Sequence, residues 1–355
     1  MKQLPIDYLG GRNVEKVWER EGFFIGEDDF EERMNTDLSK FRQENYKEGT
    51  FFGYEEKRIH YVYLKHPKER AAVVISHGFC EFVRKYDELI YYFYQLGYSV
   101  YFPEHRGHGY SYREVEEPDK VHITDFSQYV QDFKIFMDQI VKRESPAAKL
   151  FLFAHSMGGC IGARFLEEYP GYFEAAVLSS PMFALSYGKI PKCLAKILMI
   201  WSQVMGWQTK FVPGKHGFDN TYAFDTSSAL SEQRYAYIFN LRQQNVRYQT
   251  YSATYGWTKA AMEACKKALK NAGKVENPIL VTQAGQDTMV LPEAQETFVK
   301  RAKNATLLCF PDSKHEIFNA LEPERSSFFD SVFSFYEEHF PEMGDCKMGL
   351  YGIKK

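Results

Sequence analysis

The sequence lacks the long apolar segments of membrane-spanning or exported proteins. No stretch reaches about 18 uninterrupted apolar residues, so no membrane-spanning helix is expected. The N-terminal segment MKQLPIDYLGGRNVEKVWEREG has no apolar core of about 7–15 residues before a small-residue cleavage site, and it is unlike a signal peptide. We therefore expect a cytoplasmic protein.

The sequence also lacks a large excess of positive or negative charge. The 44 Lys and Arg residues are scattered among 47 Asp and Glu residues, which gives a formal net charge of −3. No long basic run occurs, so the sequence has no electrostatic footprint for DNA or RNA. Binding to nucleic acid is not expected.

Paired cysteines are absent as well. No two cysteines form a Cys-x-x-Cys pair, and several fall within apolar or helical patterns. This favours reduced, buried thiols over a disulfide framework. The six are Cys80, Cys160, Cys193, Cys265, Cys309 and Cys346.

What the chain does contain is a regular alternation of strands and helices. Hydrophobic residues make up 45% of the 355 residues, which is enough for a sizeable core. Short apolar runs predict buried strands, and apolar residues at helical spacing predict helices between them. A hairpin over 49–66 precedes strands near 71–78, 98–103, 149–154, 175–180, 277–285 and 305–310, with helices over 86–96, 126–141, 157–168, 292–303 and 326–340. The alternation predicts an α/β fold with a mostly parallel central sheet and helices on both faces.

This alternation breaks between Pro181 and Asn277, where helical patterns occur without a clear strand. About a hundred residues are too many for a loop in a compact domain, so we predict an inserted helical cap over 181–277. The core is then split into 1–180, with an N-terminal extension of about 1–48, and 278–355. The first cap helix has the apolar residues Ile190, Leu194, Ile197, Leu198, Trp201, Val204 and Met205, interleaved with Lys189, Lys192 and Lys196.

The segment KLFLFAHSMGG places Ser156 between a predicted strand and a predicted helix. A sharp strand-to-helix turn of the form Gly-x-Ser-x-Gly lifts a nucleophilic serine above the carboxyl edge of a sheet, and small residues two before and two after it allow close packing. Here those positions hold Ala154 and Gly158. We interpret Ser156 as a nucleophile; a structural serine in an ordinary turn is the alternative.

Stabilising the charge that develops on an attacked carbonyl requires two prepositioned donors. The first is the backbone N–H of Met157, the residue after the serine. The second is expected in the loop after an earlier strand, where VVISHGFCE offers the N–H of Phe79.

The base and the acid should follow the serine in the order acid, then histidine. His315 lies just after the last predicted strand and is the favoured base, whereas His216 falls in the cap and His339 in the final helix. Asp287, just after the penultimate strand, is the favoured acid, with Asp312 as its rival. The predicted triad is Ser156, Asp287 and His315.

Three further histidines, His155, His105 and His108, lie within or near these motifs. His155 is adjacent to Ser156, but neighbours on a tight turn point apart, so a structural role is favoured. His105 and His108 in EHRGHGYS form a conceivable metal pair, but no cysteine or carboxylate accompanies them at metal-ligand spacing. No metal or organic cofactor is therefore expected.

With these motifs assembled, the chain resembles the monoglyceride lipase and bacterial lysophospholipase branch of the α/β-hydrolase superfamily. The segments that carry the resemblance are SHGFCEFVRKYDEL, FPEHRGHGYS, AHSMGG and DSKHE, together with SSALSEQRYAY and SATYGWTKAAMEA in the cap. Two departures are Glu104, where that branch has Asp, and Ala154, where the serine turn has Gly. The resemblance runs from about Gly22 to Phe340.

The resemblance implies an α/β-hydrolase fold and a serine hydrolase that cleaves the carboxylic ester of a lipid with one acyl chain, such as a lysophospholipid or a monoacylglycerol. Thioesterase, short-chain esterase, acyltransferase, aminopeptidase and non-catalytic binding roles are the alternatives. The apolar cap helix could line an acyl tunnel or form the core of the cap, and its lysines could meet a membrane surface. Tyr255 and Trp257 could form a pocket wall or only pack. Peripheral contact with the inner membrane surface is therefore a further expectation.

Overall fold

The computed structural model describes residues 16–146, 148–186 and 191–340, and its centre is an eight-stranded sheet. The strand order is β1-β2-β4-β3-β6-β7-β9-β10. β1 pairs antiparallel with β2, β2 pairs antiparallel with β4, and the other neighbouring strands pair in parallel. The strands are β1 (Lys47–Phe52), β2 (Arg58–Leu64), β3 (Ala71–Ser76), β4 (Tyr98–Pro103), β6 (Leu150–His155), β7 (Ala175–Ser179), β9 (Ile279–Ala284) and β10 (Ala305–Phe310).

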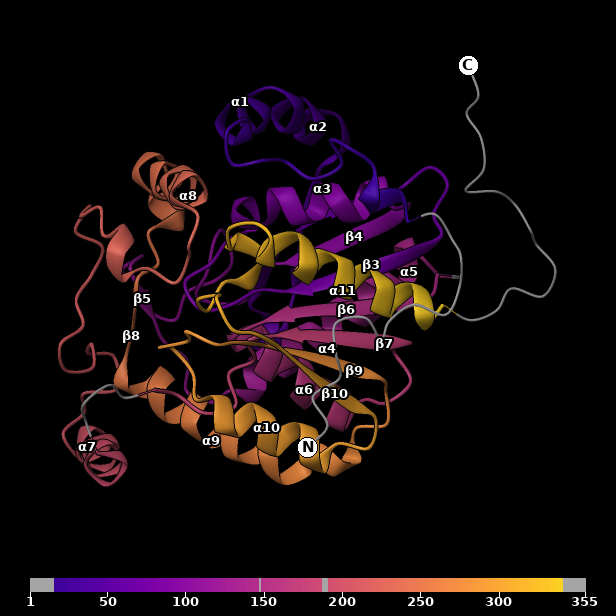
Figure 1. The fold of residues 1–355 in the computed structure, drawn as a ribbon. Helices are drawn as coiled ribbons and strands as arrows, with labels where there is room; N and C mark the ends of the chain where they lie inside the picture. The colour runs from indigo at the N-terminus through magenta and orange to yellow at the C-terminus, as the bar shows by residue number, and fades with distance from the viewer. Residues whose placement is uncertain (1–15, 147, 187–190, 341–355) are drawn as a thin grey trace, which may run out of the picture.

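Helices cover both faces of this sheet, as predicted (Figure 1). Helices α3 (Asp87–Gln95) and α11 (Glu324–Glu338) lie on one face, and α4 (Ser127–Phe136), α6 (Met157–Glu168), α9 (Tyr255–Asn271) and α10 (Pro292–Arg301) lie on the other. The remaining helices are α1 (Phe30–Asn35), α2 (Asp37–Asn45), α5 (Lys142–Glu144), α7 (Lys192–Val204) and α8 (Glu232–Gln244).

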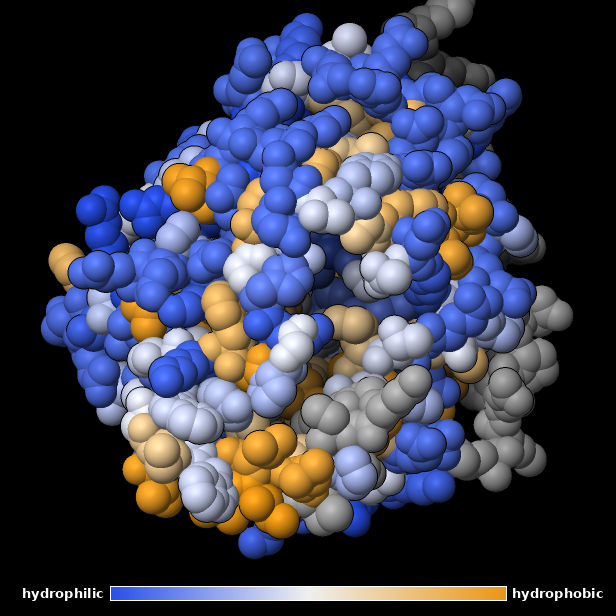
Figure 2. All heavy atoms as spheres, turned by 90° about the vertical axis from the view of Figure 1, so that its left-hand side faces the viewer, coloured by the Kyte–Doolittle hydropathy of each residue, from blue (hydrophilic) through white to orange (hydrophobic). Residues whose placement is uncertain are grey.

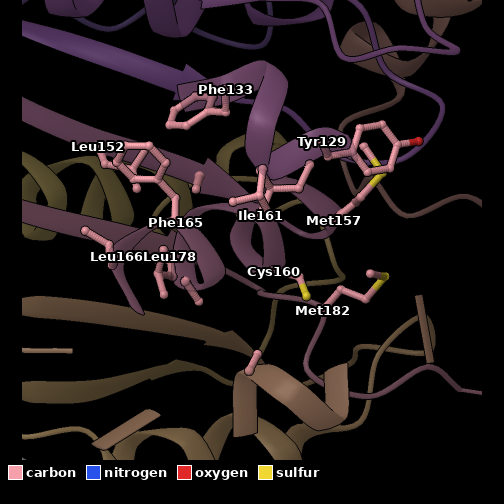
Figure 3. Packing of buried hydrophobic residues seen from close by; sticks show 14 of the residues in the cluster. Tyr129, Phe133, Leu152, Met157, Cys160, Ile161, Phe165, Leu166, Leu178 and Met182 are labelled. Atoms are coloured by element: carbon pink, nitrogen blue, oxygen red, sulfur yellow. The ribbon is translucent and has the colours of Figure 1, made fainter. Parts of the chain in front are cut away.

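Alternate residues of the central strand β6 divide the core into two layers. Leu150, Leu152 and Ala154 belong to the layer with α4, α6 and α9, whereas Phe151 and Phe153 belong to the layer with α3 and α11. Because every residue of β6 is buried, its sequence is continuously apolar rather than alternating, as expected for a strand covered on both sides. Figure 3 shows the first layer, with Ile161 and Phe165 of α6 directed among residues of the sheet and α4.

The segment after β7 departs from the alternation, as the sequence indicates. It contains α7, α8, α9 and a two-residue strand β8 (Ser252–Ala253), which pairs with β5 (Lys120–Val121). The sequence predicted no strand here, because two residues carry no periodic pattern. Helix α9 packs against α6 and adds Ala264 and Ala268 to the core layer, whereas α7 and α8 lie beyond one edge of the sheet (Figure 1).

The predicted helix over 126–141 is not uniform. Helix α4 ends at Phe136, a wider turn follows over Met137–Val141, and α5 continues from Lys142. Among the described residues, no helix is both long and apolar enough to cross a bilayer. Of the six cysteines, Cys80, Cys160, Cys265 and Cys309 are free thiols in the structure, while Cys346 lies outside the described residues.

Candidate active site

Ser156 lies on a sharp turn between β6 and α6. Its φ of 52° and ψ of −115° are unfavourable for a residue with a side chain, and tertiary contacts hold this conformation. The Ser156 N–H donates to the Ser179 carbonyl at 2.9 Å, and the Ser156 carbonyl accepts from the Met182 N–H at 2.9 Å. The end of β7 and the segment directly after it thus fix the serine at the carboxyl end of the sheet.

Small residues around the serine make this turn possible. A Cβ at Gly158 would lie 2.0 Å from the Ser76 carbonyl oxygen, so only glycine fits there. Ala154 does have a methyl group, and the residue facing it on α6 is Gly162, where an added Cβ would lie 3.2 Å from the Ala154 Cβ. The glycine at 162 therefore leaves room for the alanine that replaces the first glycine of the motif.

The structure brings Ser156, His315 and Asp287 together in one hydrogen-bonded chain. The Ser156 Oγ lies 2.8 Å from the His315 Nε2, and the His315 Nδ1 lies 2.6 Å from the Asp287 Oδ2. The other Asp287 oxygen accepts from the N–H groups of Met289 at 2.8 Å and Val290 at 3.1 Å. Ser156 and His315 are 9% and 6% exposed, so this chain is largely shielded from bulk water.

Asp287 is held as a carboxylate. Burial raises its pKa, but the hydrogen bond and charge of His315 and the two backbone N–H groups outweigh burial, and the net shift is downward. A carboxylate at Nδ1 fixes the tautomer that leaves Nε2 free to accept a proton from the serine. The rival Asp312 is exposed, and no hydrogen bond connects it to His315 among the described residues.

The two predicted oxyanion donors belong to two different segments at the carboxyl ends of β3 and β6. Met157 is the first residue of α6, and Phe79 is in the loop after β3. Within the described residues, neither backbone N–H donates a hydrogen bond. The Phe79 ring packs on Trp257, with ring centroids 4.2 Å apart, so the start of α9 covers this loop. Trp257 and Tyr255 are both buried, and the Trp257 indole Nε1–H donates to the Tyr129 hydroxyl at 3.2 Å.

A buried ionic network joins the loop of Phe79 to the loop of His315. The Lys85 Nζ lies 2.7 Å from Glu81 and 2.6 Å from Glu316, the residue after His315. Glu81 accepts from the Gly78 N–H and the Tyr86 hydroxyl, each at 2.5 Å. Burial raises the pKa of each carboxyl, but the Lys85 charge outweighs it, and both carboxylates stay ionised. Sequence reasoning missed this network; the Glu81–Lys85 spacing was its only signal.

The other histidines do not join this chain. His155 is buried with its ring centroid 4.9 Å from that of His315, its Nδ1 lies 3.1 Å from the Ser179 carbonyl, and burial lowers its pKa to about 4. His105 contacts the Ser76 hydroxyl at 2.9 Å, and His108 packs against the His77 ring. Across the described ranges, no group of three His, Cys, Asp or Glu residues is arranged to hold a metal ion.

Glu104, one of the two departures from the resemblance, is a fully buried anchor. Its carboxylate accepts from the N–H groups of Val83 at 3.1 Å and Tyr110 at 2.8 Å and contacts the His60 Nδ1 at 2.9 Å. The longer side chain thus binds three separate segments, and it holds the 104–110 turn against the Val83 segment, which follows the Phe79 loop.

The sheet order and the serine turn define a hydrolase with the α/β-hydrolase fold. The chain belongs to the serine aminopeptidase S33 family, whose model matches residues 67–323. The predicted fold class and the resemblance to this superfamily are therefore confirmed.

Sequence similarity to named relatives extends over most of the chain. It is 27% identical to lysophospholipase L2 of Escherichia coli (strain K12) over 316 residues, covering 84% of this chain and 89% of that protein. It is 28% identical to a monoacylglycerol lipase of Mycolicibacterium smegmatis, covering 82% and 97% respectively. Among solved structures, a monoglyceride lipase from Saccharomyces cerevisiae in complex with a substrate analog aligns with a TM-score of 0.67 and 17% identity, over 84% of this chain and 96% of that chain.

Proposed function

We propose that this protein is a carboxylic ester hydrolase that acts on lipids with a single acyl chain, through an acyl-enzyme on Ser156. The observation that carries the chemistry is the hydrogen-bonded chain from the Ser156 Oγ through His315 to Asp287 on a strained serine turn. The substrate class rests on the relatives, which are named as lysophospholipases and monoacylglycerol lipases.

The geometry supports a two-step reaction. The His315 Nε2, 2.8 Å from the Ser156 Oγ, accepts the serine proton as the oxygen attacks the ester carbonyl. The N–H groups of Phe79 and Met157 stabilise the oxyanion, and Asp287 stabilises the imidazolium. The alcohol leaves with the proton from His315, and water then cleaves the acyl-enzyme by the same route.

The acids near the triad argue against an aminopeptidase. A free amino terminus needs an available carboxylate in the substrate pocket, but the two buried carboxylates beside the triad, Glu81 and Glu316, are both bound to Lys85. Thioesters and short-chain esters remain substrates that the same triad could attack, and chain-length dependence separates them from lipid esters.

The test uses a fluorophosphonate probe, lysophosphatidylcholine, monoacylglycerol and p-nitrophenyl esters of increasing chain length, each with the wild type and Ser156→Ala. We expect labelling and long-chain turnover in the wild type, and neither in the variant. Wild-type protein that neither reacts with the probe nor cleaves any ester would contradict the proposal and favour a binding protein with a hydrolase fold.

We further propose that α7 contacts the lipid surface from which the substrate comes. The apolar stripe predicted for this helix neither forms the core of the cap nor encloses a tunnel, because its residues Ile197, Trp201 and Val204 are 52%, 59% and 80% exposed. Ile200, which was not part of the predicted stripe, is 65% exposed on the same helix. In Figure 2, apolar atoms gather over α7 at the lower edge of the molecule. Exposed Lys196 lies beside them, whereas Lys189 lies outside the described residues. An amphipathic helix of this kind is suited to the membrane interface.

A further inference from the structure

One pocket of the protein is lined by three arginines and by none of the proposed catalytic residues. It has a volume of about 390 Å³ and is formed by Arg58, Arg113 and Arg247 with the segment 110–116. Arg58 begins β2, Arg113 follows the 104–110 turn, and Arg247 lies in the segment between α8 and α9. The pocket therefore lies where the core and the segment 245–250 meet.

The positive charge in this pocket is not balanced by the protein. Within the described residues, none of the three guanidinium groups lies within 4.0 Å of a carboxylate oxygen. The nearby Glu114 is instead paired with Arg106 at 3.3 Å. Glu116 also lines the pocket but forms no ion pair with these arginines.

Arg113 is the most constrained of the three. Its Nη1 donates to the Gly107 carbonyl and its Nη2 to the carbonyls of Gly109 at 3.0 Å and Arg247 at 2.9 Å, while its Nε is buried without a hydrogen-bond partner. Burial lowers the pKa of Arg113 to about 10, and the charge of Arg247 adds to this shift, while the more distant Glu104 carboxylate opposes it. An uncompensated cation in such a position costs free energy that a bound anion would offset.

Arg58 and Arg247 have donors to spare. The Arg58 Nε contacts the Thr50 hydroxyl at 3.2 Å, and its terminal nitrogens form no hydrogen bond among the described residues. The Arg247 side chain likewise forms no hydrogen bond with any described residue. Planar guanidinium groups match the oxygens of a phosphate group in paired hydrogen bonds.

We propose that this pocket, lined by Arg58, Arg113 and Arg247, binds a phosphate group, either of a soluble phosphate ester or of a lipid head group. It shares no lining residue with the proposed ester-cleaving site, and β2, which begins at Arg58, lies three strands and about 14 Å from β6, which leads into Ser156. A bound phosphate would cross-link the segment 245–250 to the core loop.

The test compares thermal unfolding of the wild type with Arg58→Ala/Arg247→Ala, leaving Arg113 and its carbonyl contacts intact. Arg143→Ala, at another exposed arginine without an ion pair, is the matched control. Each is measured with inorganic phosphate, with glycerol 3-phosphate and with chloride at equal ionic strength. With a phosphate compound at about ten times its Kd, we expect the midpoint to rise by about 2 °C in the wild type and control, and not in the double variant.

Vesicles of phosphatidylcholine with or without phosphatidic acid distinguish the two sources of phosphate. Loss of phosphatidic acid-dependent binding in the double variant, without an effect of soluble phosphates on unfolding, would assign the pocket to a lipid head group. No response to any phosphate probe, or an equal response in the double variant, would overturn the proposal. Turnover of a p-nitrophenyl ester, followed in parallel, reports on the proposed serine chemistry and not on this pocket.

Discussion

At the residue scale, the serine turn is strained and compensated by its neighbours. Ser156 has a positive φ, and two backbone hydrogen bonds to the β7 end hold it there. The chemistry then depends on how His315 is oriented, because only one ring nitrogen faces the serine. Asp287 is the acid that orients His315, and a single substitution can distinguish its role from that of Asp312.

Asp287→Asn should reduce kcat about 10²–10⁴-fold, since an amide at Nδ1 favours the wrong imidazole tautomer while preserving the shape of the site. Asp312→Asn is the matched control, because Asp312 is exposed and lies three residues from His315 in the same loop. Steady-state hydrolysis of a soluble p-nitrophenyl ester measures both. Comparable losses in the two variants would mean that the acid has been misassigned.

Glu104 should make stability depend on pH through its pair with His60. Burial lowers the pKa of His60, but the Glu104 carboxylate outweighs burial, so the pKa of His60 in the folded protein lies above 6.5. Burial raises the pKa of Glu104, but His60 and two backbone N–H groups outweigh burial, so the pKa of Glu104 lies below 4.5. The His60 contribution is therefore complete below pH 6.5 and is lost as pH rises through its folded pKa. The Glu104 contribution is complete above pH 4.5 and is lost as pH falls through its folded pKa.

Glu104→Gln should lower the free energy of unfolding by about 3 kcal/mol near pH 6, since one buried partner is removed and an amide N–H₂ faces N–H donors. The loss should shrink above the folded pKa of His60, where the pair is no longer charged. Urea unfolding between pH 5 and pH 9 provides the measurement, with the exposed Glu21→Gln as control. A penalty that does not vary with pH would show that the ion pair contributes nothing beyond its hydrogen bonds.

At the scale of elements, the buried strands and the order of the site motifs could be predicted from the sequence. Strands such as β3 and β6 are covered on both faces, so their apolar runs are continuous and bounded by Gly or Ser. Ser156 and His315 each follow a strand, and parallel strands bring their carboxyl ends to one edge.

What could not be predicted depends on contacts between elements. The exposed face of α7 and the pairing of β8 with β5 are set by neighbours distant in the chain. The same is true of Lys85, whose two partners are 4 residues and 231 residues away. No local pattern signals a residue that bridges two loops.

Lys85→Met should lower kcat at least about tenfold with little change in KM for a small ester, because the loops of Phe79 and His315 lose their common anchor. Two buried carboxylates would also lose their counter-charge, at a cost of about 3–5 kcal/mol in unfolding free energy, so assays belong well below the melting temperature.

Lys85→Arg keeps the charge and should restore most of kcat. Arg84→Met is the neighbouring control, since Arg84 pairs with Asp87 at 2.7 Å and contacts neither loop. If folded Lys85→Met retains full kcat, the network stabilises the fold but does not position the site.

At the scale of the whole molecule, α7 presents an exposed apolar surface away from the central sheet. The serine turn lies at the carboxyl edge of the sheet, and α7 and α8 lie beyond one edge of the sheet (Figure 1). Exposed large apolar residues in soluble proteins are usually scattered, but α7 has five of them, Leu194, Ile197, Ile200, Trp201 and Val204, and exposed Met205 follows directly after the helix. Its buried residues Ala195, Met199 and Ser202 face the protein.

Ile197→Ser/Ile200→Ser/Trp201→Ser should therefore reduce binding to lipid vesicles at least about tenfold, since each side chain contributes apolar area that the interface would remove from water. Co-sedimentation with phosphatidylcholine vesicles measures this directly. Hydrolysis of a soluble short-chain ester should be unchanged, because these side chains face away from the core, whereas turnover of monoacylglycerol in vesicles should fall with binding.

Phe52→Ser/Leu321→Ser removes exposed apolar residues elsewhere, at 61% and 45% exposure, and should leave vesicle binding intact. Equal losses in both variants would indicate that general surface hydrophobicity, and not α7, brings the enzyme to lipid.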